Sequence, residues 1–165
     1  MSKIISIANQ KGGVGKTTTT INLATSLSAV KKNVLIVDAD PQGNASTGIG
    51  ISYQERDPSL YDLIVNGSFN EKAIKKTIVP GLDIIAANTN LAASEIELTN
   101  VENREFVISN ILTKAKNYDY VLIDCPPALG LLTINSLVAS NSVIVPLQSE
   151  FFALEGISSL VQTIE

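Results

Sequence analysis

Short apolar runs rich in β-branched residues recur along the chain and are separated by polar or mixed stretches. They occupy residues 4–8, 34–37, 82–86, 121–123 and 142–147. Within each run the apolar positions are continuous rather than alternating, which is typical of strands that are buried on both faces. The pattern therefore predicts five strands of a sheet that is covered on both faces.

Two of the intervening stretches have the spacing of helices. Between the first two runs, the small and apolar positions that repeat at this spacing are Ile21, Ala24, Leu27 and Ser28. Between the third and fourth runs, they are Phe106, Ile108, Ile111, Leu112 and Ala115. Strands that alternate with helices indicate an α/β fold, here a three-layer, open, mostly parallel sheet with helices on both faces.

The chain shows no internal repeat and no linker rich in Pro, Gly or Ser. We therefore expect residues 1–165 to form one domain. Residues 43–58 are rich in turn formers, and we expect a long, mobile loop there. The chain stops inside a stretch of helical character, so we expect this domain to be partial, the C-terminally truncated part of a longer protein.

Composition narrows the function classes. Hydrophobic residues make up 45% and charged residues 17% of the 165 residues, which argues against a disordered chain. There is no histidine and Cys125 is the one cysteine, which excludes zinc clusters, disulfide frameworks and Ser-His-Asp triads. A net charge of −4 gives no overall signature of nucleic-acid binding. Without a signal peptide or a run long enough to span a bilayer, we expect a soluble, cytoplasmic protein.

A glycine-rich loop follows the first predicted strand and precedes a helix. Its sequence is Asn-Gln-Lys-Gly-Gly-Val-Gly-Lys-Thr-Thr at residues 9–18, and Gln10 stands where the usual phosphate loop has its first glycine. Glycines allow backbone N–H groups to approach phosphate oxygens, and the helix N-terminus favours anions. The plain alternative is a turn that only connects a strand to a helix, but Lys16 would then lack an anion.

Three side chains of the loop have the chemistry of a nucleotide site. Lys16 would bridge the terminal phosphates, and the Thr17 hydroxyl would bind Mg²⁺. Thr18 is placed to contact an inner phosphate. The complete set of predicted nucleotide-binding residues is Lys11, Gly12, Gly13, Val14, Gly15, Lys16, Thr17 and Thr18.

Acidic residues follow two other predicted strands. Asp38 and Asp40 come after the second run, and Asp124 comes after the fourth. The carboxyl ends of parallel strands share one edge of a sheet, so we expect all three carboxylates to converge on the phosphates, with Mg²⁺ between them. Thr17, Asp40 and Asp124 are the candidate metal ligands, and Asp40 would also orient the attacking water. The alternative for Asp38 and Asp40 is a role in turns and caps.

These motifs in combination resemble the ParA family, and the chromosomal Soj-like members in particular. The segments that carry the resemblance are Lys-Gly-Gly-Val-Gly-Lys-Thr-Thr at 11–18, Asp-Ala-Asp-Pro-Gln-Gly-Asn at 38–44, Asp-Cys-Pro-Pro-Ala-Leu-Gly at 124–130 and Glu-Phe-Phe-Ala-Leu-Glu-Gly at 150–156. The resemblance implies a P-loop NTPase of the deviant Walker A class, a slow ATPase that uses ATP and Mg²⁺ in chromosome or plasmid partition.

The resemblance also implies roles for single residues. Lys16 corresponds to the phosphate-binding lysine, and Lys11 corresponds to the signature lysine that reaches the partner's phosphates in a nucleotide-sandwich dimer. Gly12 corresponds to a glycine at the dimer contact. Asp40 corresponds to the residue needed for hydrolysis, and Asp124 to the Walker B acid. Asp40, Lys16 and Lys11 are therefore the predicted catalytic residues.

The implied partners are a second copy of the chain, a ParB-like centromere-binding protein and nonspecific DNA, with no membrane. In the family the DNA surface lies mostly in the part that this chain lacks, and the implied location is the nucleoid within the cytoplasm. Two other functions stay open: a MinD-like, membrane-associated cell-division ATPase, and an ATP-dependent ligase or synthetase on the same scaffold.

Three further features have plain structural interpretations. We expect Cys125 to be a buried small residue rather than a reactive thiol. The lysines at 72, 75 and 76 are expected to form a solvated face. We expect the same of the acidic stretch that contains Glu95, Glu97, Glu102 and Glu105.

Overall fold

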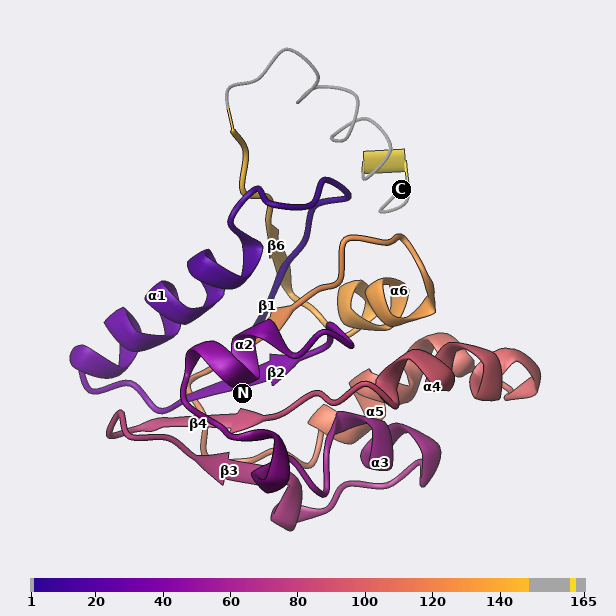
Figure 1. The fold of residues 1–165 in the computed structure, drawn as a ribbon, viewed down its shortest axis with the longest axis horizontal. Helices are drawn as coiled ribbons and strands as arrows, with labels where there is room; N and C mark the ends of the chain where they lie inside the picture. Colours follow the sequence, from indigo (N-terminus) through magenta and orange to yellow (C-terminus); the bar gives the residue numbers. More distant parts are fainter. Residues whose placement is uncertain (1, 149–160, 163–165) are drawn as a thin grey trace.

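The computed structural model of the chain describes residues 2–148 and 161–162. Within these residues, six strands form a sheet with the order β3-β4-β2-β5-β1-β6 (Figure 1). The strands are β1 (Lys3–Ile7), β2 (Val34–Asp38), β3 (Ile74–Lys76), β4 (Leu82–Ile85), β5 (Tyr120–Asp124) and β6 (Ser142–Ile144). Every pairing is parallel except that of β3 with β4. The expected mostly parallel sheet is confirmed.

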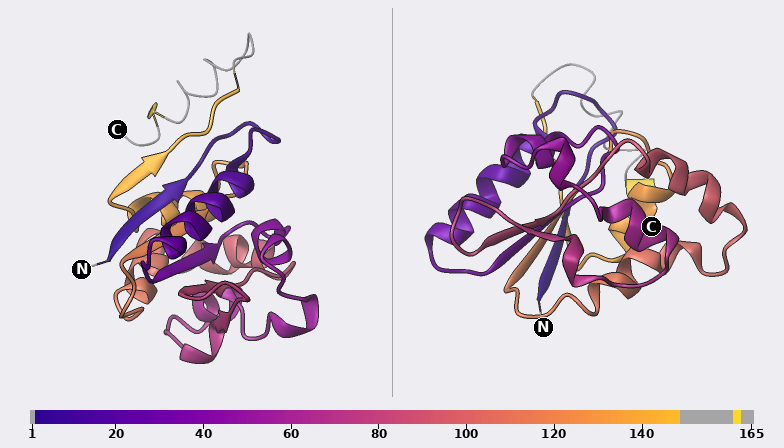
Figure 2. Two further views of the ribbon diagram at one scale, coloured as in Figure 1. Left: turned by 90° about the vertical axis from the view of Figure 1, so that its left-hand side faces the viewer. Right: turned by 60° about the horizontal axis from the view of Figure 1, so that its bottom comes forward.

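Helices cover both faces of the sheet. They are α1 (Lys16–Ala29), α2 (Asn44–Gly48), α3 (Leu60–Val65), α4 (Leu91–Glu97), α5 (Val107–Leu112) and α6 (Leu131–Val138). Figure 2 shows α1 along one side of the sheet. The α2 helix joins the hydrophobic cluster of α1, whereas α3, α4, α5 and α6 contribute to the cluster on the other side. Short 3₁₀ helices occupy Tyr53–Glu55, Glu71–Ala73, Leu98–Asn100 and Arg104–Phe106.

Two separate hydrophobic clusters account for the three layers. Alternate residues of β2 point to opposite sides, so that Val34 and Ile36 join Ala24 of α1 while Leu35 and Val37 join the cluster of α3 to α6. All four of these β2 side chains are fully buried. Burial on both faces explains why the strand sequences are continuously apolar.

The segment 43–58 is not the long, mobile loop that its composition predicts. It begins with α2, and a short 3₁₀ helix, Tyr53–Glu55, follows. Ala45, Ile49 and Ile51 are buried in the cluster that contains α1. Because these apolar side chains anchor the segment, its turn-forming residues serve as caps and corners rather than as a flexible loop.

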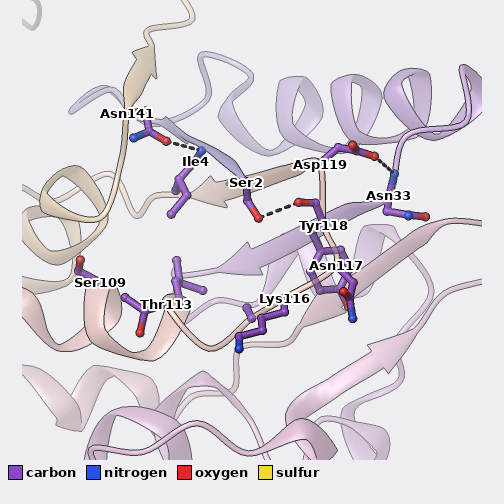
Figure 3. Close-up of a pocket in the computed structure, with 12 residues that line it drawn as sticks. Ser2, Ile4, Asn33, Ser109, Thr113, Lys116, Asn117, Tyr118, Asp119 and Asn141 are labelled. Carbon is purple, nitrogen blue, oxygen red and sulfur yellow. Dashed lines mark hydrogen bonds between the residues drawn. The ribbon is translucent and has the colours of Figure 1, made fainter.

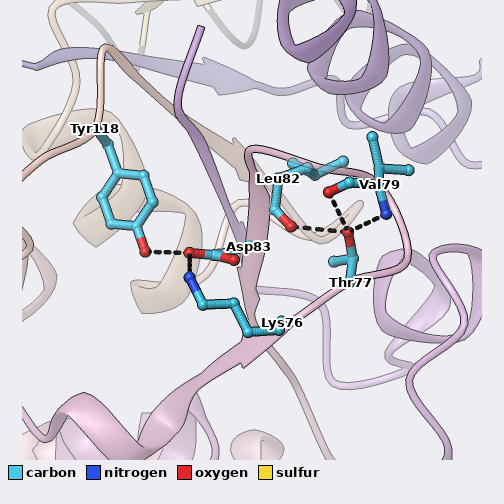
Figure 4. A network of polar contacts seen from close by, with 6 residues as sticks. All are labelled: Lys76, Thr77, Val79, Leu82, Asp83 and Tyr118. Carbon is cyan, nitrogen blue, oxygen red and sulfur yellow. Dashed lines mark hydrogen bonds and ion pairs between the residues drawn. The ribbon is translucent and has the colours of Figure 1, made fainter. Parts of the chain in front are cut away.

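The sequence pattern also misses β3, a three-residue strand at the edge of the sheet that pairs with β4 in antiparallel orientation. A polar network ties this edge together (Figure 4). The carboxylate of Asp83 on β4 accepts hydrogen bonds from Lys76 Nζ and from the Tyr118 hydroxyl, each over 2.7 Å. A strand this short and half-exposed leaves no apolar run in the sequence.

Phe106, expected on the buried face of a helix, is instead 48% exposed.

Candidate functional site

The loop between β1 and α1 has the backbone conformation that its glycines permit. Gly13 and Gly15 have φ values of 73° and 90°, in the left-handed region that residues with a Cβ rarely adopt. Gly12 is exposed but does not share this conformation, and Val14 is buried. Because α1 starts at Lys16, the first N–H groups of the helix open into the loop.

Lys16 lies inside this loop rather than in solvent. The residue is 7% exposed, and Nζ donates a hydrogen bond to the carbonyl oxygen of Lys11 over 3.0 Å. Burial lowers the pKa of the ammonium, whereas the nearby carboxylates of Asp124 and Asp40 raise it. A cation held in this position, beside the first turn of α1, is suited to bind an anion.

Asp124, at the end of β5, meets the first turns of α1. Its Oδ2 accepts a hydrogen bond from the Thr17 hydroxyl over 2.7 Å, and its Oδ1 accepts one from the Thr20 hydroxyl over 3.1 Å. Burial raises the pKa of Asp124 to about 6, while the two threonines oppose this shift. The hydroxyl and carboxylate oxygens of Thr17 and Asp124 are hard donors of the kind that Mg²⁺ prefers. Their chemistry fits a magnesium ion.

Thr20 is a contact that the sequence analysis missed. The signal for it is the run of threonines at 17–20, since residues three apart lie on the same face of a helix. Thr20 is fully buried, and its hydroxyl also donates to the carbonyl oxygen of Lys16. Thr18, by contrast, is exposed on the first turn of α1.

The three carboxylates do not all converge on the loop. Asp38 is fully buried, and its Oδ2 accepts hydrogen bonds from the Ser46 amide (2.8 Å) and hydroxyl (2.7 Å). Its Oδ1 accepts one from the Asp40 amide over 3.2 Å. Asp38 thus makes the turn and cap contacts given as its alternative. It also lies in register with Asp124, and burial, together with the charge of Asp124, raises the pKa of Asp38. Among the described residues, no group of three or more acidic, His or Cys side chains is placed to hold a metal ion.

Asp40 is placed differently. It is 8% exposed, and its Oδ1 accepts a hydrogen bond from the Gln42 amide over 2.9 Å. It also influences the pKa of both Lys16 and Asp124, so the three charged groups belong to one electrostatic neighbourhood. The structure thus brings together Lys16, Thr17, Asp124 and Asp40.

Asn9 connects the loop to the chain that leaves β6. Its Oδ1 accepts a hydrogen bond from the Lys11 amide (3.0 Å), and its Nδ2 donates to the carbonyl oxygen of Pro146 (2.8 Å). Gln148 donates to the carbonyl oxygen of Gly13 over 3.1 Å. Lys11 itself is half-buried. Asn9 was not among the predicted site residues, because its partner lies 137 positions away in the sequence.

The remaining sequence features lie away from the loop. Cys125 is buried, and burial raises the pKa of its thiol to about 12, so the expectation of an inert cysteine is confirmed. Lys75 donates to the carbonyl oxygens of Asp57 and Lys72, so the lysine cluster is only partly a solvated face. The acidic stretch is likewise only partly solvated, because Glu95 accepts a hydrogen bond from the amide of Leu132 at the start of α6.

A cavity of about 790 Å³ opens at the other edge of the sheet, near the starts of β1, β2 and β5 (Figure 3). Its lining includes Ser2, Asn33, Lys116 and Asn141 and none of the predicted site residues. The candidate site is thus not this cavity but the edge where β1, β2 and β5 end.

The sequence pattern of the AAA domain family matches residues 2–165. Across 165 residues the chain is 52% identical to the sporulation initiation inhibitor protein Soj of Bacillus subtilis, covering 99% of this chain and 65% of that protein. It is 50% identical to the chromosome partitioning protein ParA of Caulobacter vibrioides, and the match covers 99% of this chain and 62% of that protein. The chain belongs to the ParA and Soj family of AAA-domain proteins.

A third member of the ParA and Soj family, the chromosome-partitioning ATPase Soj of Treponema pallidum, is 45% identical, covering all of this chain and 64% of the relative. The chain therefore spans slightly less than two thirds of the length of these curated relatives. Among the described residues, no helix is long and apolar enough to cross a membrane.

Solved structures confirm the P-loop NTPase fold of the family. The cobyrinic acid a,c-diamide synthase of Mycobacterium smegmatis, with bound ADP and magnesium, has a TM-score of 0.94 at 37% identity, covering 99% of this chain and 67% of that chain. A plasmid partition protein of Borrelia burgdorferi bound to AMPPNP has a TM-score of 0.86 at 30% identity, and the match covers 99% of this chain and 69% of that chain.

Proposed function

We propose that the protein carrying this chain binds ATP with Mg²⁺ and hydrolyses it slowly. The observation that carries the proposal is the 2.7 Å contact between the Thr17 hydroxyl and the Asp124 carboxylate, next to the buried Lys16. It places two hard oxygen donors and one cation at the mouth of a glycine loop. Bound ADP and magnesium in the M. smegmatis structure, and AMPPNP in the B. burgdorferi structure, support this proposal.

In this proposal the loop residues 11–18 hold the triphosphate. Lys16 contacts the terminal phosphates, and Thr17 and Asp124 would hold the magnesium ion, which offsets the charge of the phosphates when bound. The Asp40 carboxylate accepts a hydrogen bond from the attacking water and orients it toward the terminal phosphate. Burial of Lys16, Asp40 and Asp124 strengthens each electrostatic contact relative to water.

We further propose that ATP acts as a switch for dimerisation during chromosome or plasmid partition. Lys11 would extend to the phosphates bound by a second copy, so that the interface forms only when those charges are present. The names of the Soj and ParA relatives support partition as the process. A ParB-like protein would stimulate hydrolysis, and binding to nonspecific DNA would place the protein on the nucleoid in the cytoplasm.

One experiment tests both the metal site and the switch. The purified protein is passed over a sizing column with light scattering in the presence of Mg²⁺ and either ATP or ADP. We expect a dimer with ATP alone, and the dimer should bind DNA of random sequence. Thr17→Val, which removes the hydroxyl at nearly constant volume, should lose this response, whereas Thr17→Ser should keep it. A monomer under every condition, with no ATP bound, would contradict the proposal.

A second candidate function is ATP-dependent amide synthesis, because the 37% identical M. smegmatis structure is named as a cobyrinic acid a,c-diamide synthase. The two candidates differ in what triggers phosphate release. A synthase consumes ATP only when its carboxylic acid substrate and a nitrogen donor are present. Turnover that depends on cobyrinic acid would favour the synthase, and turnover without it favours the partition ATPase.

A further inference from the structure

Arg56 is a buried cation close to the candidate site. The residue is only 6% exposed, and among the described residues it takes part in no ion pair. Its guanidinium carbon lies 5.7 Å from the centre of the Tyr53 ring. A buried charge without a counter-charge is costly, so its hydrogen bonds must compensate.

Those hydrogen bonds tie three separate segments together. Nη2 donates to the Thr47 hydroxyl of α2 (2.7 Å) and to the carbonyl oxygen of Ile51 (3.3 Å). Nη1 donates to the carbonyl oxygen of Ala87, which follows β4, over 3.2 Å. The amide of Ala87 in turn donates to the Ser46 hydroxyl over 3.0 Å. Arg56 and Ser46 thus fasten α2 to the carboxyl end of β4.

From Thr47 the contacts lead directly to Asp40. The Thr47 hydroxyl donates to the carbonyl oxygen of Gly43 over 3.1 Å, and the Gly43 amide donates to the carbonyl oxygen of Asp40 over 2.8 Å. Gly43 has a φ of 65°, and a Cβ at this position would collide with Nη1 of Arg56. The guanidinium therefore lies directly against the turn that carries the Asp40 carboxylate.

We propose that Arg56 is a positioning residue that fixes the Asp40 turn through Thr47 and Gly43, and thereby sets the rate of hydrolysis rather than the affinity for nucleotide. The inference rests on the proposed ATPase function, in which Asp40 orients the water. Arg56 contacts neither the loop 11–18 nor Asp40 itself in the hydrogen bonds described above. The planar guanidinium is required for this role, because it donates to three separate acceptors at once. Lysine has the same charge but cannot bind three acceptors in this geometry.

The test compares variants of Arg56 and Thr47 in the purified protein. Arg56→Lys and Thr47→Val should lower kcat for ATP by about 10-fold or more, because small misplacements of a reacting group are costly, and leave KM within about twofold. Thr47→Ser retains the hydroxyl and should restore most of the lost kcat. Arg104→Lys, a matched change on a half-buried arginine that bonds the Thr99 carbonyl, should leave kcat unchanged.

Hydrogen exchange provides a readout that does not depend on turnover. The amides of Gln42 and Gly43 are bonded to Asp40, so Arg56→Lys and Thr47→Val should speed their exchange while the amides of α1 stay protected. Unchanged kcat and unchanged exchange at 42–43 in folded Thr47→Val would overturn the inference, even if Arg56→Lys fails to fold. If the unmodified protein has no ATPase activity, the proposed function fails, and exchange alone still decides the role of Arg56 in holding the turn.

Discussion

Asp38 and Ser46 form a buried pair in which one carboxylate oxygen accepts both the amide and the hydroxyl hydrogen bonds of the serine, over 2.8 and 2.7 Å. Burial raises the pKa of Asp38 to about 7, and the two bonds from Ser46 act against that rise. The pair holds the start of α2 beside the end of β2, directly next to the Asp40 turn. The protonation state of Asp38 therefore affects the stability of the region around the candidate site.

The first prediction concerns pH. Burial also raises the pKa of Asp124, so in the folded protein both carboxyls keep protons that an unfolded chain releases above about pH 4. The free energy of unfolding should therefore fall as pH rises from about 5 to about 8. Ser46→Ala removes a hydrogen bond that favours the charged form, so it should cost about 1–3 kcal/mol at pH 8 and less at pH 5.

Urea unfolding at the two pH values measures this difference. Ser68→Ala, at an exposed serine, is the control and should shift neither curve. An equal loss of stability for Ser46→Ala at pH 5 and pH 8 would show that the Asp38 charge is not involved.

The second prediction concerns Lys16. Replacing it by alanine removes the buried ammonium that would contact the phosphates in the proposed function, and affinity for Mg-ATP should fall by about 100-fold or more, equivalent to about 3 kcal/mol. Binding of a fluorescent ATP analogue gives the dissociation constant. Lys32→Ala, at an exposed lysine, should bind normally. Affinity retained in Lys16→Ala would rule out its role as the phosphate-binding lysine.

The third prediction separates Lys11 from Lys16. Lys11→Ala should bind Mg-ATP within about threefold of the unmodified protein, because the loop amides and Lys16 remain, but should stay monomeric on a sizing column. Lys116→Ala, at the opposite edge of the sheet, is the matched control and should still dimerise. A dimer of normal affinity in Lys11→Ala would mean that this lysine does not act across an interface.

The fourth prediction concerns Asp40. Asp40→Ala should bind ATP and remain dimeric, while hydrolysis falls by about 100-fold, within the range typical of a lost general base. Phosphate release and the lifetime of the dimer can be followed in parallel. Glu102→Ala, at an exposed acid, should hydrolyse ATP normally. Undiminished phosphate release from Asp40→Ala would exclude the role in orienting water.

The sequence predicted most of what local patterns determine. Strands such as β2 are buried on both faces, and this leaves a continuous apolar run that is easy to recognise. The loop 11–18 is encoded by adjacent residues, so its glycines and Lys16 could be placed before the fold was known. The orientation of the Asp38 side chain could not be predicted in this way, since a carboxylate at the end of a strand can face either the ligand-binding end of the sheet or the protein interior.

Several of the contacts that escaped prediction join distant positions. Thr20 and Asp124 are separated by 104 positions, and Arg56 and Ala87 by 31. Residues 43–58 were misjudged because turn-forming composition says nothing about the buried Ala45, Ile49 and Ile51. Partners of this kind are set by the packing of helices such as α1 and α2 on the sheet, which no single segment of sequence contains.

Asn9 has a mechanical consequence. One side-chain amide contacts both the first N–H of the glycine loop and the carbonyl group of Pro146 where the chain leaves β6. A displacement of the loop backbone at Lys11 should therefore strain the hydrogen bond that Asn9 donates to the carbonyl oxygen of Pro146. The backbone amide of Lys11 is thus coupled through Asn9 to the segment that follows β6.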